Sequence, residues 1–292
     1  MENQRILITG ARSFIGLNLI KKLKDKNEVH VLIHNNEIEE ENVKIHKADI
    51  TRDLKKLIHE IKPDIIFHLA AYSNASRAEK HLIPAIKTNI EGTTNLLNTV
   101  KDTNLKRFIN ISSSEVYGPS ETEFIETQKL EPVSPYGITK ATAEHICNFY
   151  YKTYHVPIVN IRPIMVYGPN QPENKIIPFI MKSCKENKNF DMTSGEQTRD
   201  FIHVDDLIEA LIKSATLPVV GETFNIGTTK EISIKNLALK IKELTNSQSQ
   251  INFGAIPTKP NEVMRMHINI NKAKTLLDWE PKITLDEGLN NL

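Results

Sequence analysis

The sequence has little that would cross-link it or fix it to a membrane: two cysteines, one tryptophan and no long apolar run in 292 residues. Cys147 and Cys184 lie in different segments without CxxC spacing, which indicates reduced thiols and not a disulfide framework. No uninterrupted apolar run approaches the roughly 18 residues of a membrane helix. We therefore expect a soluble, cytoplasmic protein that does not associate with membranes.

An excess of charge of one sign is also absent. The 37 Lys and Arg residues nearly balance the 36 Asp and Glu residues, for a net charge of +1. There is no global field to attract nucleic acid, so any phosphate must be bound by local placement of groups. The ten histidines show no close metal-ligand spacing, and His68 fits a packing role at the end of a strand. We expect no catalytic metal.

What the first half contains is an alternation of short, β-branched runs with longer helical patterns. The expected strands are Ile6–Thr9, Val29–Ile33, Val43–His46, Ile65–Leu69, Phe108–Ile111 and Ile158–Ile161. Strands this apolar, separated by helices, predict a doubly wound, Rossmann-like α/β fold with a parallel sheet, over residues 1–168. Residues 169–292 are richer in Pro, Asn and Lys and predict mainly a smaller lobe, with some segments returning to the first domain.

A glycine-containing turn follows the first expected strand. Thr9-Gly10-Ala11-Arg12-Ser13-Phe14-Ile15-Gly16 leads into a helix, an arrangement that holds a pyrophosphate at a helix N-terminus. Ser13 stands where sequences of this shape usually have a third glycine, so close backbone approach rests on Gly10 and Gly16. The first domain is therefore expected to bind a dinucleotide.

The residues at the end of the second strand bear on whether the expected dinucleotide is NAD or NADP. A carboxylate there normally binds the adenosine ribose hydroxyls of NAD, but the strand ends Leu32-Ile33-His34-Asn35-Asn36, with no acid before Glu37. Arg12 and His34 are candidates to face a 2′-phosphate instead. NAD and NADP both remain open, and Asp49-Ile50 after the third strand suits contact with adenine.

A tyrosine and a lysine mark the candidate chemistry. Ser134-Pro135-Tyr136-Gly137-Ile138-Thr139-Lys140 opens a helix, and the i, i+4 spacing puts Tyr136 and Lys140 on one face. A nearby ammonium is expected to lower the pKa of the phenol, so that tyrosinate acts as a base, and Lys140 can also hold the nicotinamide ribose. The serine cluster 112–114 adds hydroxyls at the carboxyl end of a parallel strand, where such sheets place their chemistry.

Several motifs together resemble the extended short-chain dehydrogenase/reductase family. They are TGARSFIG, HLAA at 68–71, NIEGT at 89–93, SSSEVYG and SPYGITK. In the second half, RPIMVYGP at 162–169, RDFIHVDD at 199–206, FNIG at 224–227 and LDWEP at 277–281 match the nucleotide-sugar epimerase/dehydratase branch. The resemblance covers essentially the whole chain and makes the lobe a substrate-binding lobe.

The resemblance implies a set of roles. Tyr136 is the acid/base, Lys140 its partner and Ser113 the hydroxyl that shares the substrate proton, while Asn89 buttresses the site and Arg199 binds the sugar-nucleotide diphosphate. The expected cofactor contacts are Gly10, Arg12, Ser13, Phe14, Ile15, Gly16, His34, Asp49, Ile50, Leu69, Ala70, Ala71, Asn89, Tyr136, Lys140 and Pro163. The expected substrate contacts are Ser113, Ser114, Tyr136, Met165, Asn174, Lys175, Arg199, Lys259 and Arg265.

The implied substrate is a UDP-, GDP- or dTDP-hexose, and the implied assembly is a homodimer through helices around 84–100 and 134–154. Three positions depart from the pattern of the relatives. Met165 stands where many have a substrate-binding asparagine, and Lys259 replaces a second diphosphate arginine, for which Arg265 is a candidate substitute. The sugar 4,6-dehydratases carry an acidic pair where this chain has Ser114-Glu115, so Glu115 alone is left to remove a proton beside a C4 ketone.

Several reactions remain open at this level. Epimerisation or dehydration through oxidation at C4 is the leading expectation, and NAD(P)H-dependent reduction of a 4-keto-6-deoxyhexose is the alternative. A non-catalytic dinucleotide sensor would be expected to lose the pair of Tyr136 and Lys140. Reductases that do not act on sugars generally lack the arginine at Arg199.

Overall fold

Seven parallel strands form the main sheet of the computed structural model, which describes residues 1–34, 38, 40–74, 76–258 and 262–292. Their order across the sheet is β10-β6-β5-β4-β1-β2-β3. The strands are β1 (Arg5–Thr9), β2 (Glu28–Ile33), β3 (Val43–Lys47), β4 (Ile65–His68), β5 (Arg107–Ile111), β6 (Ile158–Pro163) and β10 (Thr223–Ile226). The first six confirm the predicted strands, and the seventh comes from the second half of the chain.

Successive strand residues point to opposite faces of the sheet, and on every strand except the edge strand β3 the residues of both faces are mostly buried. In β1, Ile6 and Ile8 belong to one hydrophobic cluster, whereas Leu7 between them belongs to another, and all three are fully buried. The first cluster lies under α1 (Phe14–Leu23), α7 (Val204–Thr216) and α9 (Asn271–Leu277). This two-sided burial confirms the doubly wound fold.

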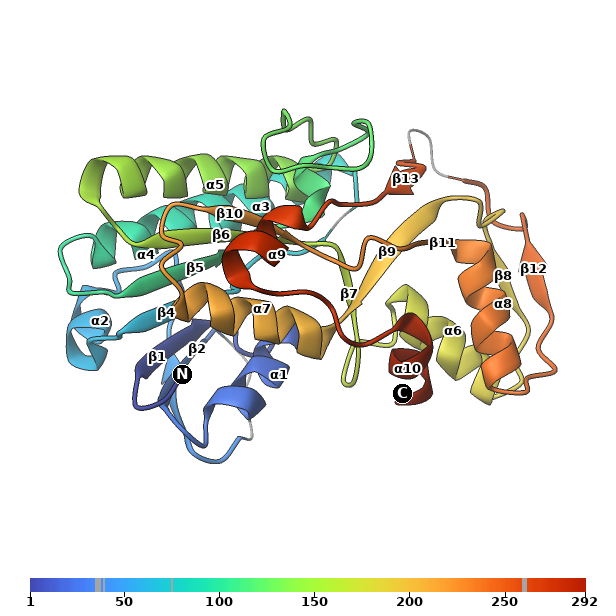
Figure 1. Cartoon of the computed structure of the whole chain (residues 1–292), viewed down its shortest axis with the longest axis horizontal. Coiled ribbons are helices and arrows are strands. Elements are labelled where there is room, and N and C mark those ends of the chain that lie inside the picture. Colours follow the sequence, from blue (N-terminus) through green and yellow to red (C-terminus); the bar gives the residue numbers. More distant parts are fainter. Residues whose placement is uncertain (35–37, 39, 75, 259–261) are drawn as a thin grey trace.

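Helices on the other face cover the second cluster (Figure 1). They are α2 (Lys55–Ile61), α3 (Leu82–Ala85), the π-helix η2 (Ile86–Gly92), α4 (Thr93–Val100) and α5 (Pro135–Tyr154), with the short turns η1 (Glu79–His81) and η3 (Ser114–Val116). Helix α5 is 20 residues long and packs against α4, η2 and β6. It is the helix on which Tyr136 and Lys140 lie.

A smaller body of short strands and helices lies at one end of the sheet (Figure 1). It comprises β7 (Met165–Tyr167), α6 (Ile176–Lys185), β8 (Phe190–Met192), β9 (Thr198–His203), β11 (Glu231–Ser233), α8 (Ile234–Leu244), β12 (Ile251–Phe253), β13 (Arg265–Met266) and α10 (Leu285–Asn290). Helices α6 and α8 pack against each other there. Their buried residues form a third cluster around Ile180 and Leu237.

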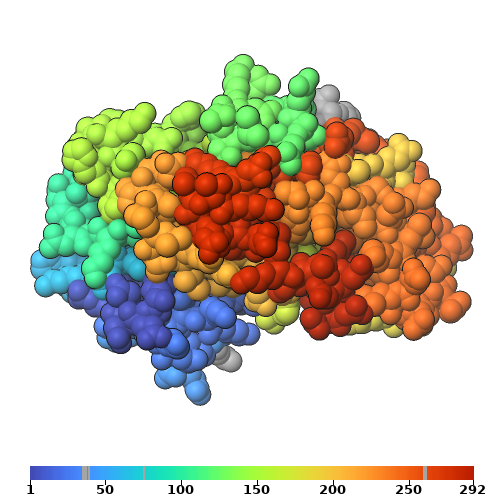
Figure 2. Space-filling view, in the orientation of Figure 1, coloured from blue at the N-terminus to red at the C-terminus, as the bar shows by residue number. Residues whose placement is uncertain are grey.

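The C-terminal segment joins the two parts. Figure 2 shows it in red, lying across the front of the molecule between the sheet and the lobe. Helix α9 packs on β10 and α7, while α10 contacts β9 in the lobe. Trp279, between them, is buried and donates its indole N–H to the Asp206 carbonyl at 3.1 Å. Within the part of the chain that the structure describes, no helix is long and apolar enough to cross a membrane.

Candidate active site

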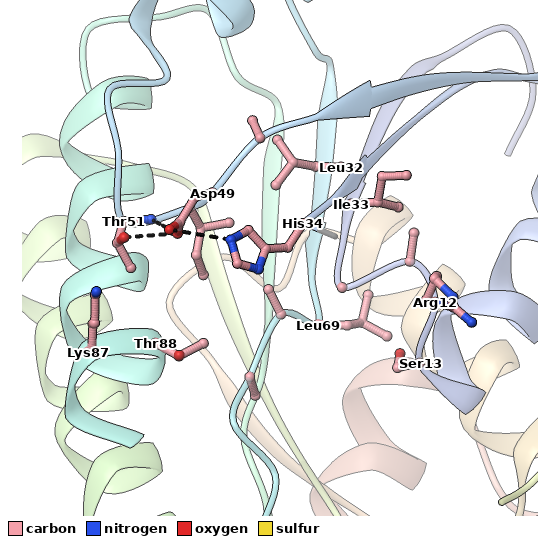
Figure 3. A pocket seen from close by; sticks show the side chains of 16 residues that line it. Arg12, Ser13, Leu32, Ile33, His34, Asp49, Thr51, Leu69, Lys87 and Thr88 are labelled. Atoms are coloured by element: carbon pink, nitrogen blue, oxygen red, sulfur yellow. Dashed lines mark hydrogen bonds and ion pairs between the residues drawn. The ribbon is translucent and has the colours of Figure 1, made fainter. Parts of the chain in front are cut away.

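A cavity of about 540 Å³ opens at the carboxyl edge of β1, β2 and β4 (Figure 3). Its lining includes Gly10, Arg12, Ser13, Ile33, His34, Asp49, Ile50, Leu69, Ala70 and Ala71, together with Lys87 and Thr88 of η2. Most of the expected cofactor contacts are therefore in one place. Lys87 and Thr88 were not expected from the sequence, because only the packing of η2 against this edge brings them to the cavity.

The turn after β1 fits a dinucleotide. Gly10 has φ +67°, and a Cβ there would lie 2.5 Å from the backbone nitrogen of Ala70, so only glycine leaves this surface open. A Cβ on Gly16 would lie 2.5 Å from the Ala11 carbonyl oxygen, which explains the second glycine. The Ser13 hydroxyl accepts a hydrogen bond from Gly16 N at 3.1 Å and caps α1. The turn thus presents a helix N-terminus suited to a pyrophosphate.

A second cavity, of about 450 Å³, holds the predicted catalytic residues. Ser113, Ser114, Glu115, Tyr136 and Lys140 line it together with Phe14, Ile15 and Pro163 from the cofactor set. Ser113 is near enough to the Tyr136 hydroxyl to lower its pKa. Lys140 Nζ lies 6.0 Å from the centre of the Tyr136 ring and donates to the Ile111 carbonyl oxygen at 2.6 Å. The fold therefore unites a phenol, a hydroxyl and an ammonium from α5 and the end of β5.

The electrostatics of Tyr136 differ from the sequence-based expectation. Burial raises the pKa of Tyr136 to about 12, with Glu115 adding to the rise, and Ser113 opposes it. The expected lowering by Lys140 is therefore wrong for this state, because desolvation of the phenolate dominates. Burial also lowers the pKa of Lys140 to about 8, so that near pH 7 the ammonium still predominates.

The start of α5 is held in place by local signals and by a buried amide. Ser134 caps the helix by accepting from Gly137 N at 3.0 Å, and Pro135 occupies its first turn. Asn89 accepts from Tyr72 N at 2.7 Å and donates to the Thr139 hydroxyl at 2.9 Å. Asn89 lines neither cavity and acts as a brace between η2 and the catalytic helix.

A buried ion pair fastens the same helix to β6. Arg162 donates to both carboxylate oxygens of Glu144, at 2.6 to 3.1 Å, and to the Tyr117 hydroxyl at 2.7 Å. Glu144 lies one helical turn beyond Lys140, and both members of the pair are buried. Glu144 was not among the site residues expected from the sequence. Its i+4 spacing from Lys140 was the available signal.

The surroundings of Glu115 shift the pKa of its carboxyl group in opposite directions. Burial raises its pKa, while Arg199 and Arg77 lower it and Glu262 raises it further. Among the described residues that line the second cavity, Glu115 is the one carboxyl group, and Ser114 beside it is a hydroxyl.

The lobe contributes a third cavity of about 460 Å³ next to the catalytic one. Arg199 lines it from β9 and donates to Glu262 at 2.5 Å and to the Thr198 carbonyl oxygen at 2.7 Å. Met165 lines both the catalytic and the lobe cavity, so the two adjoin. Glu262, which the sequence analysis did not select, lies three residues after Lys259.

Some of the remaining expected substrate contacts line these cavities and others do not. Lys175 lines the catalytic cavity, whereas Asn174 is exposed and lines none of the three cavities. Arg265 is exposed, does not line the cavity that holds Arg199, and pairs with Glu231 at 2.9 Å, so its guanidinium is already engaged. Lys259 lies outside the described residues.

His68 is fully enclosed beneath the cofactor cavity. Its ring nitrogens lie 2.8 Å from the Thr9 hydroxyl and 2.9 Å from the Thr93 hydroxyl. Within the described ranges, no three His, Cys, Asp or Glu side chains are grouped so that they would hold a metal ion.

Solved structures similar to this chain include nucleotide-sugar epimerases. A UDP-glucuronic acid 4-epimerase from Bacillus cereus, in complex with UDP-glucuronic acid and NAD, superposes with a TM-score of 0.90 at 31% identity, covering 98% of this chain and 96% of that one. A UDP-glucose 4-epimerase from Thermotoga maritima, with UDP-glucose, gives 0.92 at 28% identity, with the same two coverages.

Sequence comparisons agree with the structural ones. An uncharacterized UDP-glucose epimerase, YtcB, of Bacillus subtilis is 30% identical, with 98% of this chain and 96% of that protein covered. Human dTDP-D-glucose 4,6-dehydratase is also 30% identical, with 98% and 88% covered. The family model described as GDP-mannose 4,6 dehydratase matches residues 7–292. The chain therefore belongs to that family of extended short-chain dehydrogenases/reductases, the NAD(P)-dependent nucleotide-sugar epimerases and dehydratases.

Proposed function

We propose that this chain converts a nucleotide-diphosphate hexose, carrying UDP, GDP or dTDP, through oxidation at C4 of the sugar, and that its net reaction is 4-epimerisation. The observation that carries the proposal is that Tyr136, Lys140 and Ser113 line one cavity with the cofactor-turn residues Phe14 and Ile15. The adjoining lobe cavity contains Arg199, and Met165 lines both cavities. A sugar in the first cavity and a diphosphate in the second make one continuous ligand.

The reacting group is the Tyr136 hydroxyl. We assign it to remove the proton of the C4 hydroxyl and later to return one, with Ser113 sharing that proton. A phenolate in this buried place needs a nearby positive charge, which the Lys140 ammonium provides. When bound, the nicotinamide accepts hydride from the sugar carbon and gives it back.

The cofactor turn and the lobe have separate tasks. Gly10, Ser13 and the N-terminus of α1 would hold the pyrophosphate of the dinucleotide. Arg199 would hold the diphosphate of the sugar nucleotide with its planar fork of donors. We accordingly assign residues 1–168, with β10 added to their sheet and α7 packed against it, to dinucleotide binding, and most of 169–292 to the substrate.

Dehydration is the second candidate, and Glu115 is the observation that favours it. Loss of water requires removal of the C5 proton and protonation of the departing C6 hydroxyl. Glu115 is the one carboxyl group among the described lining residues, and burial raises its pKa. Because Ser114 takes the place of a second acid, one carboxyl would have to serve both steps.

Product analysis separates these reactions. Purified protein is incubated with cofactor and UDP-, GDP- or dTDP-hexoses. The products are separated by chromatography and their masses are measured by mass spectrometry. A new sugar of unchanged mass supports epimerisation, and loss of one water supports dehydration. Turnover of none of them, with turnover of 4-ketosugars and reduced cofactor, would replace the proposal with ketoreduction.

We propose a homodimer in the cytoplasm as the working state. Ile83, Ile138 and Phe149 are 72%, 43% and 51% exposed on α3 and α5, which pack side by side. Ile138 and Phe149 are separated by about three helical turns and so share one face of α5. Large apolar side chains gathered on neighbouring helices suit a self-complementary interface. Both free cysteines are buried and unpaired, as suits a reducing compartment.

A further inference from the structure

The ring of His68, which the sequence indicates as a packing residue, also takes part in a series of buried hydrogen bonds. Thr9 at the end of β1 is bonded to its Nδ1, and Thr93 at the start of α4 is bonded to its Nε2. All three side chains are 2% exposed or less. Groups this deeply buried have to satisfy one another, so the direction of each hydrogen bond can be worked out from its neighbours.

The Thr93 hydroxyl determines which ring nitrogen of His68 carries the proton. It lies 2.6 Å from the Asn89 carbonyl oxygen, which can only accept, so Thr93 donates its one proton there. Its oxygen is then left to accept from His68 Nε2, at 2.9 Å. The imidazole proton therefore lies on Nε2.

The other ring nitrogen, Nδ1, accepts a proton. Burial, with a contribution from the Lys140 ammonium, lowers the pKa of His68 to about 3, so the ring is neutral near pH 7. Thr9 consequently donates its hydroxyl proton to Nδ1 over 2.8 Å, and its oxygen accepts from Ala70 N at 3.2 Å. A proton on Nδ1 would place two donors opposite each other.

Asn89 continues the series to the catalytic helix. Its side-chain oxygen accepts from Tyr72 N, so its Nδ2 donates to the Thr139 hydroxyl at 2.9 Å. That hydroxyl in turn donates to the carbonyl oxygens of Pro135 and Tyr136 in the first turn of α5, both at 2.9 Å. The hydrogen bonds thus pass from two central strands to the helices α4 and α5 on one face of the sheet (Figure 1). We call this series the His68 network; its members are Ala70, Thr9, His68, Thr93, Asn89 and Thr139.

The two ends of the His68 network lie at different parts of the cofactor site. Ala70 lines the first cavity, and its backbone nitrogen faces Gly10 of the glycine turn. Tyr136 and Lys140 line the catalytic cavity, where hydride transfer requires the nicotinamide. Ser13 lines both cavities, so they adjoin. A dinucleotide that extends through both would contact the protein at both ends of the network.

We propose that His68, protonated at Nε2, is a positioning residue that holds the adenosine side and the nicotinamide side of the dinucleotide site at a fixed spacing. A fixed spacing favours a ligand that binds both sides at once, because less freedom is lost when it binds. The spacing does not affect a ligand that binds one side alone. The inference rests on the dinucleotide part of the proposed function and is independent of which sugar reacts.

The position of the proton can be observed without cofactor or sugar. The full chain is labelled with nitrogen-15 at its histidines, and the nuclear magnetic resonance signals that disappear in His68→Gln identify His68. We expect a proton on Nε2 and none on Nδ1, with no titration between about pH 5.5 and pH 8. A proton on Nδ1, or a titration midpoint near the usual value of about 6.5, would overturn the proposal.

Ligand binding to variants tests the positioning role. Thr93→Val removes the partner of His68 Nε2. It should weaken binding of NAD+ or NADP+, whichever the wild-type protein binds, by roughly fivefold, as for the loss of one hydrogen bond. Binding of 5′-AMP, which reaches only the adenosine side, should not change. Thr93→Ser keeps the hydroxyl and should restore dinucleotide binding, while Thr139→Val interrupts the network at its other end and should show the same selective loss.

Thr94→Val is the matched control. Thr94 makes the same kind of bond to a helix carbonyl, that of Ile90 at 2.8 Å, but is not a member of the His68 network. This variant should bind both ligands as the wild-type protein does. Equal losses for 5′-AMP and the dinucleotide in Thr93→Val and Thr139→Val, or no loss for either ligand, would leave His68 with a packing role and overturn the proposal.

The outcome also separates this inference from the proposed reaction. A wild-type protein that binds neither dinucleotide would overturn the dinucleotide assignment and the positioning role with it. A selective loss of dinucleotide binding in the variants of a protein that converts no sugar would support the inference and count against the proposed reaction.

Discussion

Arg199 and Glu262 form a short, largely buried ion pair, with 2.5 Å between the guanidinium nitrogen and Glu262 Oε1 and side-chain exposures of 9% and 21%. The arginine that we assign to the substrate diphosphate is thus paired with a carboxylate. A diphosphate entering the lobe cavity has to compete with that carboxylate for the same donors.

Neutralising Glu262 should therefore favour diphosphate binding. We predict that Glu262→Gln increases the affinity for inorganic pyrophosphate by roughly three- to tenfold, because repulsion and competition are both removed. Arg199→Gln should weaken it by roughly tenfold or more, through loss of charged hydrogen bonds. Titration is done with the dinucleotide site saturated, so that only the lobe is available. Weaker binding in Glu262→Gln would show that the pair does not oppose the ligand.

Removing the Tyr136 hydroxyl should affect turnover and not binding. We predict that Tyr136→Phe lowers kcat by roughly 10²- to 10⁴-fold, the usual contribution of acid/base catalysis. The dissociation constants for cofactor and sugar nucleotide should change little. Tyr154→Phe, at the exposed end of the same helix, is the control and should retain full turnover. Comparable kcat values in the two variants would remove Tyr136 from the mechanism.

Much of this site could be predicted from the sequence because its signals are local. The turn at Gly10, the capped start of α5 and the spacing of Tyr136 and Lys140 each depend on a few adjacent residues. The i, i+4 pattern needs nothing more than a helix to put both side chains on one face. The same holds for β1, β2, β4, β5 and β6, whose apolar runs show their burial on both faces, whereas β3 is a largely exposed edge strand.

The remaining features depend on contacts between distant segments. Strand β10 joins the main sheet beside β6 only because the chain returns from the lobe, and its four residues were not among the expected strands. The partners Arg199 and Glu262 are 63 positions apart. The raised pKa of Tyr136 arises from desolvation in the folded protein, whereas the sequence showed only the lysine that would oppose it.

Acid stability should depend on His68. Burial lowers the pKa of His68 from 6.5 to about 3. At pH values between these two, His68 is therefore protonated in the unfolded chain and neutral in the folded one. The stabilisation is complete above pH 6.5 and is lost as the pH falls below it. We predict a loss on the order of 2 kcal/mol between pH 7.5 and pH 5 from this residue.

Chemical denaturation over this pH range, in matched variants, isolates the effect of His68. The slope of unfolding free energy against pH should be reduced in His68→Gln. His145→Gln, which replaces an exposed histidine on α5, should keep the wild-type slope. Equal slopes in all three proteins would mean that His68 is protonated in the folded state as readily as in the unfolded one.

Charged substitutions at exposed apolar residues should disrupt the proposed dimer interface. Ile83→Glu with Phe149→Glu places one charge on an exposed apolar position of α3 and one on an exposed apolar position of α5, and sedimentation should then show a monomer in place of a dimer. Leu239→Glu makes the same kind of change at a 43% exposed position on α8 and should remain dimeric. A wild-type protein that sediments as a monomer at micromolar concentration would contradict the proposal.

The most direct test of the central claim follows a deuterium atom placed at C4 of the nucleotide hexose. If the sugar is oxidised at C4, the label must leave that carbon. We predict that it returns to C4 in a sugar of inverted configuration, as in an epimerase. Its appearance at C6 after loss of water would identify the dehydratase instead. Recovery of every substrate in the panel unchanged, by a protein that binds its cofactor, would contradict C4 chemistry on nucleotide sugars.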